Sequence, residues 1–424
     1  MPEASLLSDA LVRDLMAVGQ VDVLVGVPTL NNAATVEAVV RAVSKAFVRY
    51  FPRERTLLLN SDGGSTDGTS TLVRASTLDE AGTVTVSHRL RTEHRISAPY
   101  HGLPGKGSAL RQILTVADLT QARAVAVLDA DVTTVTPEWI AALVSPVKDQ
   151  QYDYVAPAYA RHPADGPLVS QIVRPLFRAA YGWQVREPLA AEFGCSNRFL
   201  AHCLEQDIWE SELARYGIDL WITGAALAGG FRCCQAPLGP RRHAATPDRP
   251  GFHETFQQVV GATFGCIEQH ACYWLTRTGS EPLPVVGAPL GDASEPPAIE
   301  GSRLTQSFRD DLHNLEGVLA AILSPAILEG LQAAARGEGD VRFSDELWAS
   351  TVVECLIAHH RGVMKREHIA QAMMPLYLGR TGSFLTQHGG SDPAAVEAAL
   401  TSLAAQFELL KPDIVNQWTQ NSQR

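Results

Sequence analysis

The 424-residue chain has no run approaching the roughly 18 consecutive apolar residues that a membrane-spanning helix requires. It also has no polybasic stretch: 35 Lys and Arg residues stand against 46 Asp and Glu residues, for a formal net charge of −11. This balance argues against nucleic acid as the main partner, because there is no basic surplus to neutralise phosphates. It offers no attraction to an anionic membrane either. We therefore expect neither a nucleic-acid partner nor a membrane partner.

Cysteine is scarce and shows no pairing pattern. The seven cysteines are an odd number without a Cys-x-x-Cys pair, and Cys233 and Cys234 are neighbours and so poor disulfide partners. Residues 1–20 mix Asp9, Arg13 and Asp14 with apolar residues, which predicts an amphipathic helix rather than a signal peptide. We expect a cytoplasmic protein with reduced thiols.

The length and composition predict more than one domain. A chain that is 46% hydrophobic and 19% charged is typical of a soluble globular protein, and its length favours two domains. Residues 279–301 hold five prolines and several glycines without periodicity, which is typical of a linker. The prediction is a catalytic domain over 1–278, a linker over 279–301 and a helical C-terminal subdomain over 302–424. That subdomain is interpreted as serving packing or oligomerisation, with a homodimer as the candidate assembly.

Strand and helix patterns alternate in the first half of the chain. Strands are expected at Val21–Val27, Leu57–Leu59, Val84–Val86 and 124–129, with a helix inside Asn31–Tyr50. This alternation predicts an α/β fold with a mostly parallel, doubly wound sheet. A further strand is expected at 154–156, and helices are expected at 169–181, 209–217, 221–228 and 252–276. The rest of the chain is expected to be helical, with one helix starting at Asp392-Pro393.

Two carboxylates follow the apolar strand 124–128. Asp129 and Asp131 are two residues apart, so their side chains point to the same side at the carboxyl end of the strand, where open α/β sheets bind ligands. Adjacent carboxylates repel each other unless a cation lies between them, and a hard divalent ion bridging to phosphate would suit them. On this stretch alone, a strand that ends in solvated turn aspartates is an equally good interpretation.

Three other polar turns are expected at neighbouring strand ends, and the topology would bring all four to one crevice. In these turns Asp62 could accept a hydrogen bond from uracil or guanine. Gly105 and Gly107 would let the backbone approach phosphate, while Lys106 supplies a charge, unless it is a solvated surface lysine. The four turns are Pro28-Thr-Leu-Asn31, Asp62-Gly-Gly-Ser-Thr-Asp67, Gly105-Lys-Gly107 and Asp129-Ala-Asp131.

Together these motifs resemble the nucleotide-sugar glycosyltransferases of the GT-A fold. Within that group the chain resembles the glucosyl-3-phosphoglycerate synthases and mannosylglycerate synthases, over roughly residues 20 to 275. The resemblance implies a Rossmann-like GT-A catalytic domain. The segments that carry the closer resemblance are Pro104-Gly-Lys-Gly107, Pro188-Leu-Ala-Ala-Glu192, Tyr216-Gly-Ile-Asp219 and Arg242-His243.

The resemblance also implies roles for individual residues. Asp131 and His243 would ligate Mg²⁺ or Mn²⁺. Asp129 would lie on the ribose side or behind the direct ligands. An imidazole beside a carboxylate suits Mn²⁺ somewhat better than Mg²⁺. Without the resemblance, His243 would be read as a loop histidine. The implied nucleotide-sugar contacts are Pro28, Leu30, Asn31, Asp62, Gly63, Gly105, Lys106, Asp129 and Ala130, and the implied catalytic group is Lys106, Asp131, Glu192 and Asp219.

Three residues are implied to contact the acceptor. Glu192 and Asp219 would face the transferred sugar and the acceptor, where a carboxylate can bind sugar hydroxyls or take the acceptor's proton. Asp219 could instead cap a helix after Gly217. Arg161 would bind an acidic acceptor, unless it is a surface arginine.

The chain departs from the family pattern at two places. The family's first motif usually has a glutamate after the asparagine, whereas Asn32 and Ala33 follow Asn31 here. The enzymes that use phosphoglycerate carry Gly-Arg-x-Thr, and an ungapped match places Gly166-Pro-Leu-Val169 at that position. Both the cation and the hydroxyl are missing, so a phosphorylated acceptor loses its bidentate partner. This favours unphosphorylated glycerate or another small acceptor.

The expected function is that of a metal-dependent, retaining glycosyltransferase. It would move glucose or mannose from a UDP-, GDP- or ADP-hexose to a small hydroxy acid of the glycerate or 3-phosphoglycerate type. A product resembling the compatible solutes glucosylglycerate or mannosylglycerate follows from the resemblance only. No isolated nucleophile is evident, so we expect front-face attack assisted by the leaving phosphate, with positioning and charge supplying the rate.

Two alternatives remain open. A sugar-1-phosphate nucleotidyltransferase shares the sheet and the metal carboxylates, but its glycine-rich loop should stand where Pro28-Thr-Leu-Asn31 is. The other alternative is a nucleotide-binding module without catalysis, whose helical tail serves assembly.

Overall fold

The computed structural model describes residues 7–75, 93–99, 105–160, 162, 165–243, 251–289, 301–336 and 340–420. The chain divides into two compact units, which we call the sheet unit and the helical unit. The expected strand Val84–Val86, the residue Arg161 and Pro104 of the Pro-Gly-Lys-Gly segment lie outside the described residues. The sheet unit comprises Met1–Ala160, Leu189–Pro247 and Leu283–Ala293, and the helical unit comprises Arg161–Pro188, Asp248–Pro282 and Ser294–Arg424.

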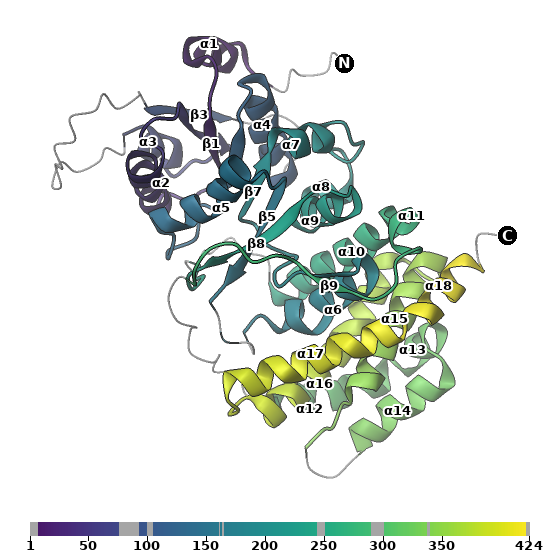
Figure 1. Ribbon diagram of the computed structural model, residues 1–424. Helices are drawn as coiled ribbons and strands as arrows, with labels where there is room; N and C mark the ends of the chain where they lie inside the picture. The colour runs from purple at the N-terminus through teal and green to yellow at the C-terminus, as the bar shows by residue number, and fades with distance from the viewer. Residues whose placement is uncertain are drawn as a thin grey trace. The chain divides into compact units, whose positions relative to one another are not determined.

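A seven-stranded sheet with the order β3-β2-β1-β4-β7-β5-β8 forms the core of the sheet unit (Figure 1). β7 pairs antiparallel with both β4 and β5, and the other neighbours pair in parallel. The predicted α/β class with a mostly parallel sheet is therefore confirmed. The strands are β1 (Val23–Thr29), β2 (Thr56–Asp62), β3 (Glu93–Pro99), β4 (Ala124–Val127), β5 (Tyr154–Tyr159), β7 (Phe193–Ser196) and β8 (Cys233–Leu238).

Helices cover both faces of this sheet. The apolar stripe of α2 and the helix α5 pack over one face in a single hydrophobic cluster that includes Val25 of β1. On the other face α4 packs so closely on β1 that a Cβ added at Gly26 would lie 2.4 Å from Ile113. The helices of this unit are α1 (Asp9–Val18), α2 (Val36–Tyr50), α3 (Thr69–Ala75), α4 (Lys106–Leu119), α5 (Pro137–Gln150), α7 (Asn197–Leu204), α8 (Glu212–Tyr216) and α9 (Ile218–Ala228).

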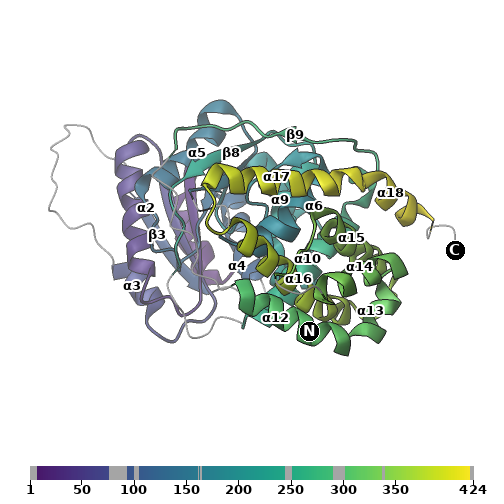
Figure 2. The same cartoon turned by 90° about the horizontal axis from the view of Figure 1, so that it is seen from below.

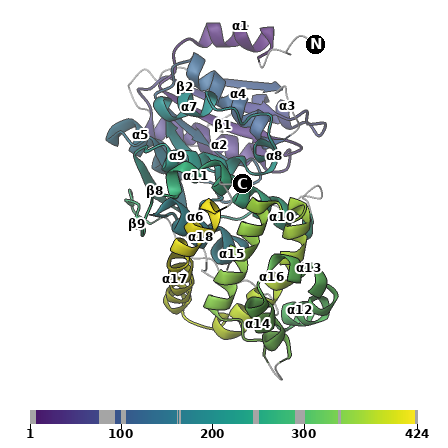
Figure 3. The same cartoon turned by 90° about the vertical axis from the view of Figure 1, so that its right-hand side faces the viewer.

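The helical unit consists of packed helices and one short strand pair. α17 lies along α6 (Figure 2), and α16 packs against both α12 and α10 (Figure 3). Its elements are the π-helix η1 (Val169–Val173), α6 (Arg174–Tyr181), the pair β6 (Trp183–Gln184) and β9 (Glu281–Pro282), α10 (Phe252–Gln269), α11 (Ala271–Trp274), α12 (Gly301–Asn314), α13 (Glu316–Ile322), α14 (Pro325–Arg336), α15 (Asp345–Arg361), α16 (Arg366–His388), α17 (Pro393–Leu409) and α18 (Lys411–Thr419).

The helix predicted over 169–181 changes its hydrogen-bond pattern at Arg174, one residue before Pro175. Proline has no backbone N–H, so an α-helix through this point would leave the carbonyl of Gln171 without its donor. Nε1 of Trp348 supplies that hydrogen bond at 2.8 Å.

The bounds of the two units differ from the predicted ones, which placed the catalytic domain at 1–278 and the helical subdomain at 302–424. Residues 161–188 and 248–282 group with the helical unit because their helices pack on α16 and α17. Part of the predicted linker joins the sheet unit instead: the Gln235 N–H donates to the Pro284 carbonyl, and the Val286 N–H donates to the Gln235 carbonyl, both at 2.8 Å. This stretch of the predicted linker therefore extends one edge of the sheet.

Two further findings concern the whole described chain. None of its helices is long and apolar enough to cross a membrane. All seven cysteines are free thiols, and of these only Cys272 is exposed.

Candidate active site

The turns after β1 and β2 are hydrogen-bonded into one structure. Asn31 adopts a left-handed conformation with φ 55°, which asparagine tolerates better than most residues. Its N–H donates to Ser65 Oγ at 2.8 Å, and its Oδ1 accepts from the Thr66 N–H at 3.0 Å. The Ala33 N–H donates to Asp67 at 2.9 Å. The asparagine of the first motif thus fixes the second turn, while its neighbour Leu30 is exposed.

Asp62 organises the turn that follows it. Its Oδ1 accepts from the hydroxyls of Thr29 and Ser65, and its Oδ2 accepts from the N–H groups of Gly64 and Ser65. Burial opposes ionisation, but these hydrogen bonds outweigh it and lower the pKa of Asp62. Because a carboxylate has about four acceptor positions, contact with a nucleobase would need one of these bonds to be exchanged. The base contact stays a prediction.

Lys106 is the first residue of α4, and its ammonium joins two carboxylates. Nζ donates to Asp129 Oδ1 at 2.8 Å and to Asp219 Oδ2 at 3.1 Å. Burial opposes the charge of Lys106, but these carboxylates more than compensate and raise its pKa. The flanking glycine Gly107 has a packing role, because a Cβ there would lie 2.2 Å from the Ala214 carbonyl oxygen of α8.

The segment 241–243 is bound alongside the residues that follow β4. Val132 and His243 form an isolated antiparallel bridge, and the Thr133 N–H donates to the Arg242 carbonyl at 2.9 Å. This pairing places His243 Nδ1 2.9 Å from Asp131 Oδ1. The structure therefore brings together the two residues predicted as metal ligands, although they are far apart in sequence.

Arg241 was not predicted from the sequence, although it pairs with two carboxylates of this site. Its Nε and Nη2 donate to Glu192 at 3.0 and 3.2 Å, and Nη2 also lies 3.2 Å from Asp129 Oδ2. Nη1 contacts Nε2 of His243. Burial opposes ionisation of Arg241, but Glu192 and Asp129 raise its pKa. The available signal was an arginine two residues before the predicted histidine ligand.

Glu192 is fully buried, with its side chain 1% exposed. In addition to Arg241 it accepts a hydrogen bond from the Tyr159 hydroxyl. Tyr159 was not predicted either, because an aromatic residue at the end of an apolar strand looks like a core residue.

Asp219 lies in the first turn of α9. Its Oδ2 accepts from Lys106, while its buried Oδ1 has no hydrogen-bond partner among the described residues. Burial raises the pKa of Asp219 to about 6, and Lys106 opposes this rise. The alternative of an N-cap is not realised, since α9 starts after Gly217 without a side-chain cap.

A divalent cation fits this arrangement as a site with two protein ligands. Two adjacent ligands around an octahedral ion with bonds of about 2.1 Å lie about 3.0 Å apart, close to the 2.9 Å between Asp131 Oδ1 and His243 Nδ1. Asp129 faces Lys106 and Arg241, which lower its pKa against the effect of burial. The described residues contain no group of three or more His, Cys, Asp or Glu side chains placed for a metal. The remaining ligands would have to come from substrate or water.

The other predicted contacts lie around this cluster. The Ala130 carbonyl accepts from the Thr35 hydroxyl at 2.6 Å, which fixes the backbone between the two aspartates. Pro28 pairs with Ser61 of β2 in the sheet, and the Gly63 N–H donates to the Thr29 carbonyl at 2.7 Å. Gly105 has φ 147° and precedes α4. Their contacts to a nucleotide sugar stay predictions.

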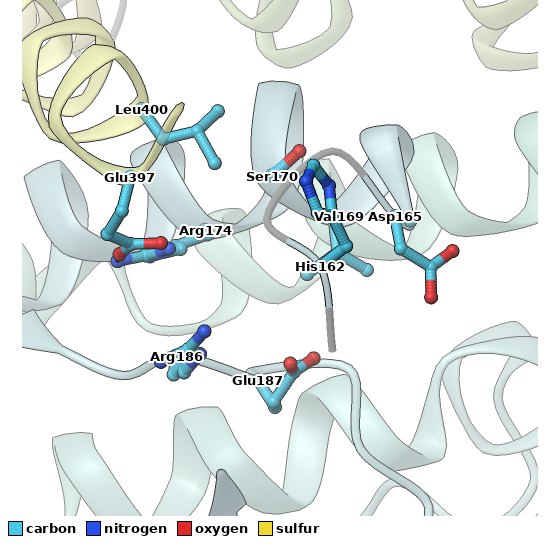
Figure 4. Close-up of a pocket in the computed structure, with 10 residues that line it drawn as sticks. His162, Asp165, Val169, Ser170, Arg174, Arg186, Glu187, Glu397 and Leu400 are labelled. Carbon is cyan, nitrogen blue, oxygen red and sulfur yellow. Dashed lines mark hydrogen bonds and ion pairs between the residues drawn. The ribbon is translucent and has the colours of Figure 1, made fainter. Parts of the chain in front are cut away.

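A second feature is a small pocket within the helical unit (Figure 4). Arg174 and Glu397 form an ion pair at 2.6 Å in its wall, and Oε2 of Glu397 is buried without a hydrogen-bond partner among the described residues. The lining carries two arginines and a histidine against three carboxylates. It consists of His162, Asp165, Gly166, Val169, Ser170, Arg174, Arg186, Glu187, Glu397 and Leu400.

Comparison with known proteins identifies the class of the first part of the chain. Residues 24–200 match the model of the family described as Glycosyl transferase family 2, so this part of the chain carries a glycosyltransferase domain. No curated protein matches the chain.

Several solved structures are similar to the chain. One is glucosyl-3-phosphoglycerate synthase from Mycobacterium tuberculosis with Mn²⁺, UDP and glucosyl-3-phosphoglycerate, at 21% identity and TM-score 0.43, over 63% of this chain and 86% of that chain. Another is the same synthase with Mg²⁺ and UDP, at 22% identity and TM-score 0.42, over 61% of this chain and 83% of that chain.

Proposed function

We propose that the protein transfers a hexose, glucose or mannose, from a nucleoside diphosphate sugar to a small hydroxy acid, with Mg²⁺ or Mn²⁺ as cofactor. The observation that carries the proposal is the cluster at the carboxyl end of β4. There the Asp131–His243 pair lies beside two partly buried cations, Lys106 and Arg241. The match of residues 24–200 to a glycosyltransferase family supports the same reaction class.

The charges of this cluster suit a diphosphate leaving group. Asp131 and His243 would hold the divalent ion, which supplies positive charge next to the diphosphate. Lys106 and Arg241 are held by carboxylates in a partly buried site, where fixed charges stabilise a developing anion more strongly than in water. The protein's contribution is then mainly to orient the donor and to stabilise the leaving phosphate.

Asp219 is suited to contact the transferred sugar. Its Oδ1 is a buried acceptor without a donor among the described residues, and leaving such an atom unpaired costs about 1–3 kcal/mol. A sugar hydroxyl would satisfy it. The ion pair with Lys106 keeps Oδ2 fixed while Oδ1 receives that hydroxyl.

The proposed outcome is retention of configuration by front-face attack. Glu192 is buried against Arg241 and Tyr159, so it is badly placed to act as a nucleophile. In the proposed step the bond from the anomeric carbon to the diphosphate oxygen breaks and a bond to the acceptor oxygen forms. The acceptor's proton passes to the leaving diphosphate.

The proposed acceptor is an unphosphorylated hydroxy acid such as glycerate. Pro167 and Val169 offer neither a cation nor a hydroxyl to a phosphate. Glycerate carries a single carboxylate and depends less on a bidentate cation than a phosphate dianion does.

The experiment is a panel of UDP-, GDP- and ADP-glucose and -mannose with Mn²⁺ or Mg²⁺, measured first as thermal stabilisation. Glycerate and 3-phosphoglycerate are then added, and the product and its anomeric configuration are determined by NMR. We expect one nucleotide to stabilise the protein in a metal-dependent way and glycerate to be glycosylated. Absence of stabilisation by every nucleotide would contradict the proposal.

A further inference from the structure

Glu192 makes its hydrogen bonds inside the protein. Oε1 accepts from Arg241 Nη2 at 3.2 Å, and Oε2 accepts from Arg241 Nε at 3.0 Å and from the Tyr159 hydroxyl. With its side chain 1% exposed, this carboxylate has no face open to a sugar or an acceptor. A role in direct contact with substrate, as the resemblance implies, would require these bonds to break.

The Nη1 and Nη2 groups of Arg241 also contact two residues of the proposed metal and nucleotide site. Nη2 lies 3.2 Å from Asp129 Oδ2 and Nη1 contacts His243 Nε2. The guanidinium carbon also lies 5.3 Å from the centre of the Tyr159 ring, within the range of a cation–π contact. Arg241 therefore joins the buried Glu192 to residues that the proposed reaction uses.

Three adjacent strands hold this connection in place. Tyr159 ends β5, Glu192 immediately precedes β7, and Arg241 is the third residue after β8. These strands are neighbours in the order β7-β5-β8. A bidentate carboxylate–guanidinium pair restricts rotation of the arginine much more than a single hydrogen bond does.

We propose that Glu192 is a positioning residue: together with Tyr159 it holds the Arg241 guanidinium against Asp129 and His243, and it acts on the reaction only through Arg241. The inference rests on the proposed function for the role of the site, but the pairing itself does not. It replaces the expectation that Glu192 contacts the sugar or the acceptor.

A double-mutant cycle tests whether Glu192 acts through Arg241. Glu192→Gln, Arg241→Met and the double variant are compared in nucleotide dissociation constant by calorimetry, in kcat and acceptor KM, and in unfolding midpoint. Glu192→Gln should weaken nucleotide binding or lower kcat by about 10- to 100-fold, as loss of a group that orients a functional residue does. Glu192→Gln should change acceptor KM by less than about threefold. When Arg241→Met is already present, adding Glu192→Gln should change nucleotide binding and kcat by less than about twofold.

Two further variants separate positioning from stability. Asp153→Asn is the matched control, because Asp153 is another buried carboxylate of the sheet unit that pairs with an arginine, Arg198. It should lower the unfolding midpoint without changing nucleotide binding. Tyr159→Phe removes one hydrogen-bond donor to Glu192 but leaves the bidentate pair with Arg241. It should therefore change nucleotide binding or kcat in the same direction as Glu192→Gln, but less. This variant keeps the test available if Glu192→Gln does not fold.

Three results would overturn the inference. The first is an effect of Glu192→Gln that is as large in the Arg241→Met background as in the parent. The second is a rise in acceptor KM with nucleotide binding unchanged, which would indicate direct contact with the acceptor. The third is no coupling between the two residues in the unfolding midpoint. A parent protein that binds no nucleotide contradicts the proposed function instead, and the coupling in unfolding still tests the pairing.

Discussion

Nδ1 of His243 lies 2.9 Å from Oδ1 of Asp131, although the two residues are 112 positions apart in the chain. The bridge between Val132 and His243 and the bond from Thr133 to Arg242 produce this approach. A carboxylate and an imidazole at this separation can share one divalent ion.

Asp131→Asn and His243→Ala should each lower transfer activity by roughly 10²- to 10³-fold, the loss seen when one group that stabilises developing charge is removed. Both side chains are partly exposed, so the unfolding midpoint should stay close to that of the parent. The measurement is initial rate against metal concentration, with Asp149→Asn as control, because that carboxylate is mostly exposed and pairs with Lys148. Parent-like rates in both site variants would contradict the metal assignment.

Ionisation of Asp219 should appear in the pH dependence of activity. Its pKa is about 6, raised mainly by burial and opposed by Lys106. If the carboxylate is the active form, kcat should rise with pH through about 6, and Asp219→Asn should remove that limb. Removing the opposing charge with Lys106→Met should move the midpoint upward. A profile that is flat between pH 5 and 7 in the parent would count against a role for this carboxylate.

Ionisation of Asp219 should also make the stability of the folded protein depend on pH. The folded pKa of about 6 exceeds the ordinary value of 3.8, so the folded state binds this proton more tightly than the unfolded state. Its contribution to stability is fully present below pH 3.8 and is lost as the pH rises through 6. Asp219→Asn should therefore gain stability relative to the parent between pH 4 and 7, measured as the free energy of unfolding in denaturant.

Gly107→Ala should destabilise the sheet unit. The new Cβ would lie 2.2 Å from the Ala214 carbonyl oxygen, so the start of α4 or α8 must move. Overpacking of this kind costs typically about 1–3 kcal/mol. The control is Gly261→Ala, another helical glycine, where a Cβ has open space and should stabilise by up to about 1 kcal/mol. Equal unfolding midpoints for the two variants would show that the contact with α8 is unimportant.

Asp153 should stabilise the protein at neutral pH and not in acid. Burial opposes its ionisation, but hydrogen bonds from Arg198, the Arg232 N–H and Ser196 lower its pKa. A lowered folded pKa gives stability that is present above pH 3.8 and is lost as the pH falls through the folded value. Asp153→Asn should thus be less stable than the parent at pH 7, and the difference should shrink toward pH 3. A constant difference across this range would contradict the assignment.

The pair Pro167→Arg and Val169→Thr should improve use of 3-phosphoglycerate. The two changes restore a cation and a hydroxyl that can bind a phosphate, so the ratio of kcat/KM for 3-phosphoglycerate over glycerate should rise by about 10-fold or more, the size of one charge-assisted hydrogen bond. Ser170→Ala, a change at the residue next to Val169, serves as control. If the parent already prefers 3-phosphoglycerate, the argument from Pro167 and Val169 fails.

Much of the sheet could be predicted because burial on both faces gives a readable pattern. β1, β2 and β4 are apolar runs that end in polar turns, and their carboxyl ends hold the motifs that sequence analysis identified. β3 (Glu93–Pro99), β7 and β8 were missed. Phe193–Ser196 is only four residues long, and Cys233–Leu238 contains a glutamine and a proline, so neither shows a clear period.

The site was predicted in its residue types but only partly in its connections. The pairing of Lys106 with Asp129 and Asp219 depends on α4 and α9 approaching the end of β4, which no local pattern specifies. Arg241 was overlooked because its meaning comes from a buried carboxylate almost fifty residues earlier. The glycine at 107 was identified, but as a phosphate contact, whereas the backbone of α8 explains why no side chain fits there.

The most direct test of the account is calorimetric titration of UDP, GDP and ADP into the parent protein and into Asp131→Asn, each with and without Mn²⁺. We expect that one nucleotide binds the parent and that Mn²⁺ tightens this binding by at least about 10-fold. Asp131→Asn should remove the effect of Mn²⁺, while weak metal-independent binding through Lys106 and Arg241 remains. Nucleotide binding of equal strength with and without Mn²⁺ in both proteins would contradict it.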